Sequence, residues 1–261
     1  MTEQTPARQR SFFWRTLTLI LIIVSLFSVA NVVILGIETL DRPERPVPGE
    51  LLYASTFDAF NQEWSQFEGQ MSSQIVDGSL VIKVDAAQDG TYSVLNHDFS
   101  DFDVRVDARR ISAEDPYNEI GLMFRYHDRD NYYMFKIVGD GSYCVERHQG
   151  GKIESLSACH PSPAVLPGLN AVNQIRVVGQ GNRFQFTIND QALILCPKGS
   201  DKFSTWSGDD CLSNNKKTSP ILVDDTFDYG KIGVGVRVRA PGIQVAFDNV
   251  LVSGPQPLTN P

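Results

Sequence analysis

The sequence predicts an all-β domain, an antiparallel sandwich or barrel, that follows one N-terminal transmembrane helix. Residues 16–37 form an apolar run without a single charge. Many later segments alternate polar and apolar residues with the two-residue period of half-buried strands, and turn residues separate them. No helical period stands out after residue 60, so the predicted sheets must pack on one another.

The apolar run is long enough to cross a hydrocarbon core of about 30 Å at about 1.5 Å per residue. Arg8, Arg10 and Arg15 precede it, whereas the charges after it are roughly balanced. Because basic flanks stay in the cytoplasm, we expect a cytoplasmic tail at residues 1–15 and an extracytoplasmic location for everything after residue 37. The predicted localisation is the cell membrane, crossed once by a signal anchor.

A cleaved signal peptide is the alternative to this anchor. Ser28, Val29 and Ala30 have the small-x-small character of a cleavage site, and an apolar core precedes them. Cleavage there would leave residues 31–37 as an apolar mature terminus, which a secreted protein has little reason to keep. We therefore expect the uncleaved anchor, and both interpretations export the domain.

The rest of the chain divides by composition. Residues 38–50 are predicted to be an extended linker, because Pro43, Pro46 and Pro48 exclude a helix or a central strand. Residues 51–254 suit one domain with a substantial core, and residues 255–261 are expected to form a flexible tail.

The net charge of −8 falls entirely on the exported part, since residues 1–50 carry five basic and five acidic groups. An acidic surface disfavours nucleic acid and anionic lipid as partners. We therefore expect no nucleic-acid partner for the domain.

All four cysteines follow the apolar run, which fits an oxidising compartment. Of the three possible pairings, spacing favours Cys144–Cys159 and Cys196–Cys211, each closing a short local loop. The second would staple an irregular segment. A metal site is the alternative, but the sequence has no Cys-x-x-Cys motif.

The clearest strand is residues 102–109, where Phe102, Val104 and Val106 alternate with charged residues. Similar alternation predicts further strands at residues 80–84, 120–126, 132–138, 143–147, 175–178, 184–188, 232–238 and 243–252. Turn residues such as those of His127-Asp128-Arg129-Asp130 separate them.

The register of two hairpins can also be predicted. We expect Tyr126 to lie opposite Tyr133, and Lys136 to lie opposite Cys144 in the next hairpin, since a one-residue slip would mix the two faces. The face turned away from the core would then collect Arg125, Tyr132, Met134, Lys136, Glu146 and His148.

Several segments resemble the concanavalin A-like jelly-roll superfamily, in particular bacterial domains described as 3-keto-disaccharide hydrolase or laminin-G-like. They are GLMFRYHDRDNYYMFKIVGDGSYCVERHQGGK from residue 121, NQIRVVGQGNRFQFTINDQAL from residue 173, FDYGKIGVGVRV, VAFDNVLV and the opening TFDAFNQEWSQFEG. The resemblance covers nearly all of residues 53–252 and implies a jelly-roll sandwich. Residues 197–222, which include Trp206, depart from it as an insertion.

This superfamily includes sugar-binding modules, glycoside hydrolases and protein-binding domains on one scaffold. A hydrolase needs two carboxylates across a cleft. The laminarinase-type pattern Glu-x-Asp-x-x-Glu is missing, and so is a Gly-x-Ser-x-Gly elbow, so Glu146 is the one weak catalytic candidate. The sequence leans away from an enzyme.

Sugar binding has more support, because aromatic rings and planar polar side chains hold sugars. The predicted ligand-binding residues are Arg125, Tyr132, Lys136, Glu146, His148 and Trp206, with Tyr117 as a further loop residue at the rim. The alternative is an ordinary solvated sheet face in which Arg125 pairs with Glu146. Trp64 is expected in the core.

Calcium is the one cofactor that the resemblance suggests. Asp58 and Asp248 resemble positions at which related jelly rolls clamp an ion between their terminal strands. Alternatively, Asp58 caps a turn and Asp248 bonds nearby backbone amides.

Together these features predict a membrane-anchored, extracytoplasmic carbohydrate-binding or adhesion module whose partner is a carbohydrate or cell-surface glycan. One alternative is a glycoside hydrolase that acts on di- or polysaccharides. The other is a protein-interaction domain of an envelope complex.

Overall fold

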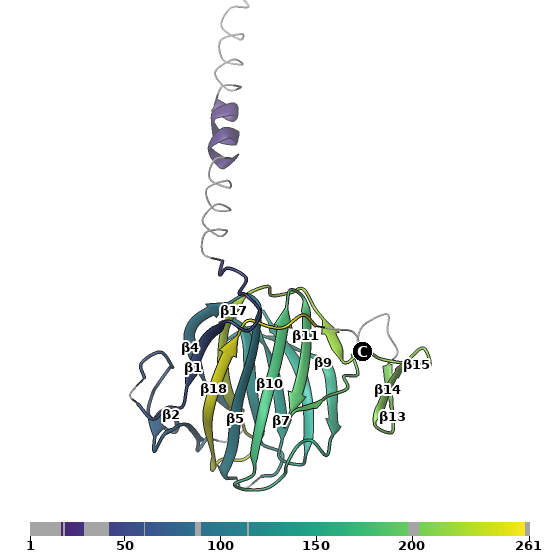
Figure 1. The fold of residues 1–261 in the computed structure, drawn as a ribbon. Coiled ribbons are helices and arrows are strands. Elements are labelled where there is room, and N and C mark those ends of the chain that lie inside the picture. Colours follow the sequence, from purple (N-terminus) through teal and green to yellow (C-terminus); the bar gives the residue numbers. More distant parts are fainter. Residues whose placement is uncertain are drawn as a thin grey trace, which may run out of the picture. The chain divides into compact units, whose positions relative to one another are not determined.

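A computed structural model of the protein describes residues 17, 19–28, 42–59, 61–86, 90–113, 115–197 and 204–258. The chain forms two compact units, Met1–Arg42 and Pro43–Pro261. Within the expected span, residues 17 and 19–28 are helical (Figure 1), and residues 16, 18 and 29–37 lie outside the described part. Among the described residues, no helix combines the length and the apolarity that a membrane crossing requires. The transmembrane helix therefore stays a prediction.

The second unit is a sandwich of two antiparallel sheets (Figure 1). The strands of the first sheet in the described part of the chain are β1 (Leu51–Ser55), β2 (Met71–Val76), β3 (Ser79–Val84), β5 (Phe102–Ser112), β10 (Val172–Gln180), β11 (Arg183–Ile188), β12 (Gln191–Ala192), β16 (Ile221–Val223) and β18 (Ile243–Ser253). Their order is β12-β11-β10-β5-β18-β3-β2, with β1 paired to β18 and β16 paired to β11.

The second sheet forms the other layer. Its strands are β4 (Gly90–Phe99), β6 (Glu119–Asp128), β7 (Asn131–Val138), β8 (Ser142–Gln149), β9 (Lys152–Pro161) and β17 (Gly230–Arg237). Their order is β4-β17-β6-β7-β8-β9, and we call this the six-stranded sheet. Each of the segments predicted as a strand is a strand, so the all-β antiparallel sandwich is confirmed.

Alternation within the strands builds the core. Phe102, Val104 and Val106 of β5 are at most 1% exposed, whereas Arg105 and Asp107, which follow Val104 and Val106, are partly exposed. Burying one such side chain stabilises the fold by about 1.5–3 kcal/mol. Trp64 is also buried, as expected, at 2% exposure.

The β6–β7 hairpin differs from its predicted register by two residues. Phe124, rather than Tyr126, lies opposite Tyr133. Beyond this pair the register shifts at a bulge, where Arg125 adopts the left-handed φ of 48°. An extra residue in one strand re-aims the side chains that follow. The bulge directs Arg125 into the core and Tyr126 to the outer face, so both predicted placements were wrong.

The β7–β8 hairpin has the predicted register, with Lys136 opposite Cys144. Both predicted disulfides are present as well. Cys144–Cys159 joins the neighbouring strands β8 and β9. Cys196–Cys211 closes the loop of the insertion. The segment within this loop was expected to be irregular, but part of it belongs to a small three-stranded sheet of β13 (Ser204–Ser207), β14 (Asp210–Ser213) and β15 (Lys216–Lys217).

The described residues of the linker lie against the sandwich. The backbone N–H of Gly49 donates to the carbonyl of Gly254 at 2.8 Å, and the Ser100 hydroxyl donates to the carbonyl of Glu44 at 2.8 Å. Near the other end of the chain, the Leu258 N–H donates to the Gln180 side chain at 3.2 Å. Segments on both sides of the domain are thus fixed to it by hydrogen bonds.

Candidate functional site

The outer face of the six-stranded sheet carries two adjoining pockets that share Arg237. The first, of about 290 Å³, is here called the apolar pocket and is lined by Gly90, Thr91, Tyr92, Met123, Tyr132, Met134, His148, Ile153, Gly235, Val236 and Arg237. The second, of about 400 Å³, is called the polar pocket and is lined by Tyr117, Glu119, Lys136, Glu146, Arg237, Val238 and Arg239. Together they form the groove.

Two glycines shape the middle of this face. Gly121 of β6 and Gly235 of β17 lie opposite each other in the middle of the sheet. Met134 fills the space over Gly121, where an added Cβ would lie 2.2 Å from the methionine methyl carbon. Gly235 lines the apolar pocket, and the absence of a side chain there leaves the centre of the groove open.

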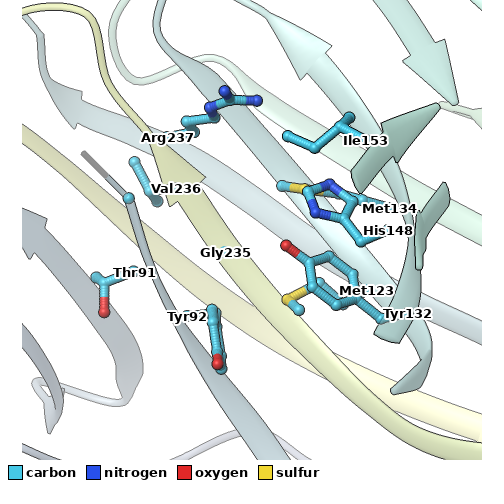
Figure 2. A pocket seen from close by; sticks show the side chains of 11 residues that line it. Thr91, Tyr92, Met123, Tyr132, Met134, His148, Ile153, Gly235, Val236 and Arg237 are labelled. Carbon is cyan, nitrogen blue, oxygen red and sulfur yellow. The ribbon is translucent and has the colours of Figure 1, made fainter. Parts of the chain in front are cut away.

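Tyr92, Tyr126 and Tyr132 form a cluster beside the groove, which we call the tyrosine cluster. The rings of Tyr92 and Tyr126 are 5.5 Å apart, and those of Tyr126 and Tyr132 are 5.9 Å apart. Burial raises the pKa of Tyr132 to about 12, so its hydroxyl stays protonated and can donate a hydrogen bond. Figure 2 shows this hydroxyl directed toward the middle of the apolar pocket.

His148 stacks on Tyr132, with ring centroids 4.1 Å apart and planes at 16°. The two residues are cross-strand partners on β7 and β8, which explains why their rings meet. Figure 2 shows them side by side at one side of the apolar pocket, with Tyr92 and Thr91 across from them. The stacking holds the Tyr132 hydroxyl and the imidazole nitrogens of His148 at the wall of this pocket.

Lys136 lies between two carboxylates in the polar pocket. Its ammonium donates to Glu119 at 2.9 Å and to Glu146 at 2.6 Å, and its side chain is 3% exposed. His148 Nε2 lies 3.7 Å from Glu146 Oε2, an ion-pair distance that is too long for a hydrogen bond. Burial alone would raise the pKa of Glu146, but contact with His148 and the charge of Lys136 outweigh it and hold the pKa at about 2.

Arg237 and Arg239 complete the polar pocket. Arg237 is the last residue of β17, and its cross-strand neighbour is Glu119. The Arg239 guanidinium lies 5.3 Å from the ring centre of Tyr117, a cation–π contact that holds both side chains at the rim. Tyr117 therefore occupies the rim position expected for it.

Four of the six predicted ligand-binding residues come together on this face: Tyr132, Lys136, Glu146 and His148. Arg125 does not, because its side chain is buried on the core side, where its guanidinium lies 3.9 Å from Asp101 instead of pairing with Glu146. Trp206 also lies elsewhere. It is half-buried and stacks on His160 with 3.6 Å between ring centres, and it lines neither pocket of the groove.

Sequence reasoning missed Tyr92, Tyr126, Arg237 and Arg239. Tyr92 belongs to β4, which no clear alternation marks. Tyr126 was assigned to the wrong face because the bulge at Arg125 has no sequence signal such as a glycine. Arg237 could have been found, because it is the charged residue in the otherwise apolar run IGVGVRV.

The calcium candidates Asp58 and Asp248 do lie near each other. Burial raises the pKa of Asp248, and the nearby charges of Asp58 and Asp107 raise it further. The Asn249 N–H donates to Asp248 at 2.6 Å, and the Thr56 hydroxyl donates to Asp58 at 2.8 Å. Among the described residues, no group of three or more His, Cys, Asp or Glu side chains is placed to hold a metal ion. The calcium site stays a prediction.

The fold and the groove define a jelly-roll domain with a candidate binding face on one sheet. The chain belongs to the family of 3-keto-alpha-glucoside-1,2-lyase-like domains, whose model matches residues 53–253. No protein of curated function matches it.

Solved structures share the fold at low identity. The carbohydrate-binding module CBM66 of Bacillus subtilis is 16% identical with a TM-score of 0.52, over 73% of this chain and 95% of that one. A Bacillus subtilis protein of unknown function with a galectin-like fold is 15% identical with a TM-score of 0.53, over 80% and 97%. A Bacillus licheniformis beta-glucanase is 9% identical with a TM-score of 0.50, over 78% and 98%. These likenesses establish the jelly-roll fold.

Proposed function

We propose that the domain binds a carbohydrate in the groove of the six-stranded sheet. The observation that carries this proposal is the junction of an aromatic pocket with a charged pocket at Arg237. Sugars present apolar C–H faces and rings of hydroxyls, which require both kinds of surface side by side. The family name refers to a glucoside, and the similar structures include a carbohydrate-binding module and a glucanase, which agrees with this ligand class.

Charged hydrogen bonds would give the groove its specificity. Glu119 and Glu146 can accept from sugar hydroxyls through the lone pairs that Lys136 leaves free. Lys136 lies between the two carboxylates, and its positive charge offsets part of their mutual repulsion in this partly buried site. The tyrosine cluster and Met123 supply the apolar contact.

We further propose that residues 16–37 anchor this domain outside the membrane. The support is the uncharged run with three arginines before it. The two disulfides agree with an oxidising compartment. Fusing a reporter to either end of the chain in cells and testing its access to protease tests this orientation.

Binding can be tested with immobilised glycans and the full chain. Tyr92→Ala and Glu119→Gln should each weaken binding at least tenfold, because each removes a direct contact. Trp206→Ala is the matched control and should bind like the wild type, since Trp206 lines neither pocket. Loss of binding in the control alone would place the site on the insertion instead. No binding and no turnover in any form would favour the protein-interaction alternative.

Elimination on a 3-keto-glucoside is a second candidate function. In such a reaction a base removes the C2 proton next to the ketone, the C1 substituent leaves with its electron pair, and a C1=C2 double bond forms. The imidazole of His148 lies at the apolar pocket and would act as the base, and Lys136 and Arg237 would stabilise the developing oxyanion. The family name favours this chemistry over two-carboxylate hydrolysis.

The contacts of Lys136 with Glu119 and Glu146 argue against hydrolysis. Lys136 occupies the space between Glu119 and Glu146, and a pKa of about 2 leaves Glu146 ionised at neutral pH. A glycosidase needs one of its carboxyls protonated to act as the general acid. Incubation with an aryl 3-keto-glucoside tests elimination: the enone product should absorb in the ultraviolet and disappear with His148→Ala. Unchanged turnover in that variant would refute the assignment of His148 as base.

A further inference from the structure

The polar pocket contains two exposed arginines. Arg237 and Arg239 are exposed, and in the part of the chain that the structure describes neither guanidinium forms an ion pair. The other cation of this pocket, Lys136, is held by two carboxylates at 2.9 and 2.6 Å. Glu119, the cross-strand neighbour of Arg237, is therefore already engaged.

The arginines are placed where a ligand in the groove would meet them. Arg237 lines both pockets, and Figure 2 shows its side chain at one end of the apolar pocket, near Ile153. Its positive charge acts on the Tyr132 hydroxyl, which lies in the same pocket. Arg239 is held over the Tyr117 ring at 5.3 Å, so its guanidinium is positioned before any ligand arrives.

The charge balance of the polar pocket points to an anion. Glu119 and Glu146 contribute two negative charges, whereas Lys136, Arg237 and Arg239 contribute three positive charges. The polar pocket thus has a local excess of one positive charge, whereas the whole chain has a net charge of −8. Because the two carboxylates are bonded to Lys136, the arginines are the groups free to meet a negative substituent.

We infer that the groove takes an acidic sugar, a uronate whose carboxylate is bound by Arg237 and Arg239 while its ring contacts the tyrosine cluster. This inference rests on the proposed carbohydrate binding and adds the chemical class of the ligand. A planar guanidinium matches a planar carboxylate through paired N–H donors, which favours a uronate over a sulfated sugar. Opposite charge also steers the ligand to the groove against the negative field of the rest of the domain.

The test compares oligosaccharides that differ only in charge. The probes are tetramers of galacturonate, glucuronate and mannuronate, each with its fully methyl-esterified form, titrated into the full chain by calorimetry. For the uronate that binds, the acid should bind at least tenfold tighter than its ester in about 50 mM salt, and the difference should shrink in about 500 mM salt, where charges are screened within a few ångströms. Arg237→Gln should weaken binding of the acid by about tenfold to a hundredfold and weaken binding of the ester by a clearly smaller factor.

Lys83→Gln is the matched control, because it removes one positive charge from β3 of the other sheet and should not alter binding. Equal binding of acid and ester would overturn the inference and leave carbohydrate binding standing. A sulfated galactose tetramer that binds as tightly as the uronate would overturn the choice of a carboxylate. No binding of these probes or of any neutral glycan would instead refute the proposed function itself.

Discussion

The guanidinium of Arg125 donates to backbone carbonyls of three separate segments. Its acceptors are Phe227 at 2.5 Å, Gly181 at 2.6 Å and Ser100 at 3.2 Å. The side chain is fully buried over the ring of Phe184, so it ties the ends of several strands to the core. These three hydrogen bonds and the carboxylate of Asp101, 3.9 Å from the guanidinium, offset the cost of burying its charge.

Arg125→Met should therefore destabilise the domain by about 3 kcal/mol or more, because it leaves three carbonyls without a donor. Urea unfolding followed by tyrosine and tryptophan fluorescence measures the change. Arg129→Met is the control: Arg129 lies in the β6–β7 turn with 82% of its side chain exposed, and the change should be below about 0.5 kcal/mol. Similar values for both variants would contradict the role assigned to Arg125.

Glu146 gives the fold a defined acid sensitivity. Its pKa falls from an ordinary 4.5 to about 2 in the folded domain, which corresponds to about 3 kcal/mol of stabilisation. A depressed carboxyl pKa stabilises the fold above the unfolded-state pKa, and this contribution is lost as the pH falls from about 4.5 to about 2.

Glu146→Gln should thus lower the free energy of unfolding by about 3 kcal/mol at pH 7 and by almost nothing near pH 2. Denaturant unfolding of both forms across this range tests the prediction. Glu154→Gln removes a carboxylate that is 54% exposed and paired with Arg147, and its effect at pH 7 should be below about 1 kcal/mol. If the difference in the free energy of unfolding between the wild type and Glu146→Gln does not change with pH, Glu146 is not held ionised.

Strand β17 shapes the groove because two residues of its outer face have no side chain. Gly233 and Gly235 occupy the positions that would otherwise carry side chains, and Arg237 is the next residue of this face. A Cβ at Gly235 would lie 3.3 Å from Tyr92 Cβ and 3.6 Å from Met123 Sδ, so a small side chain can be accommodated at modest cost.

Gly235→Val should fill the centre of the groove and weaken glycan binding at least tenfold, while it costs about 1–3 kcal/mol of stability through crowding. Titration with an oligosaccharide that binds the wild type, together with thermal unfolding, separates the two effects. Thr205→Val places the same valine side chain at an exposed position of the insertion and should change neither. Retained binding in Gly235→Val would place the ligand outside the apolar pocket.

Strand patterns reveal the groove only in part. The β7–β8 hairpin was predictable because an uninterrupted alternation sets which residues share a face, and Tyr132, Lys136, Glu146 and His148 follow that rule. The β6–β7 hairpin was not predictable, because a bulge at Arg125 moves one side chain inward and the next outward, and no glycine marks its position in the sequence. Residues contributed by distant strands, such as Tyr92 and Arg237, come together only through the sheet order β4-β17-β6, which alternation does not encode.

At the scale of the whole molecule, the insertion is a separate addition to the sandwich. Strands β13, β14 and β15 pair only with one another in the described part of the chain. The described residues attach this small sheet to the sandwich through the Cys196–Cys211 disulfide, the stack of Trp206 on His160, and the hydrogen bond from Thr218 to the carbonyl of Leu195 at 2.8 Å. A unit held by few contacts opens independently of the core around it.

Replacing both Cys196 and Cys211 by serine should therefore remove hydrogen-exchange protection from strands β13 and β14 and leave strands β6 and β7 protected. The disulfide closes a loop with a sequence separation of 15. On the loop-entropy model it lowers the conformational entropy of the unfolded chain, which stabilises the folded insertion by about 3 kcal/mol. The double replacement of Cys144 and Cys159 is the matched comparison, because that bond has the same separation but joins β8 to β9 within the six-stranded sheet. It should reduce protection in the sheet and weaken binding in the groove. If loss of Cys196–Cys211 instead reduced protection throughout both sheets, the insertion would be an integral part of the sandwich.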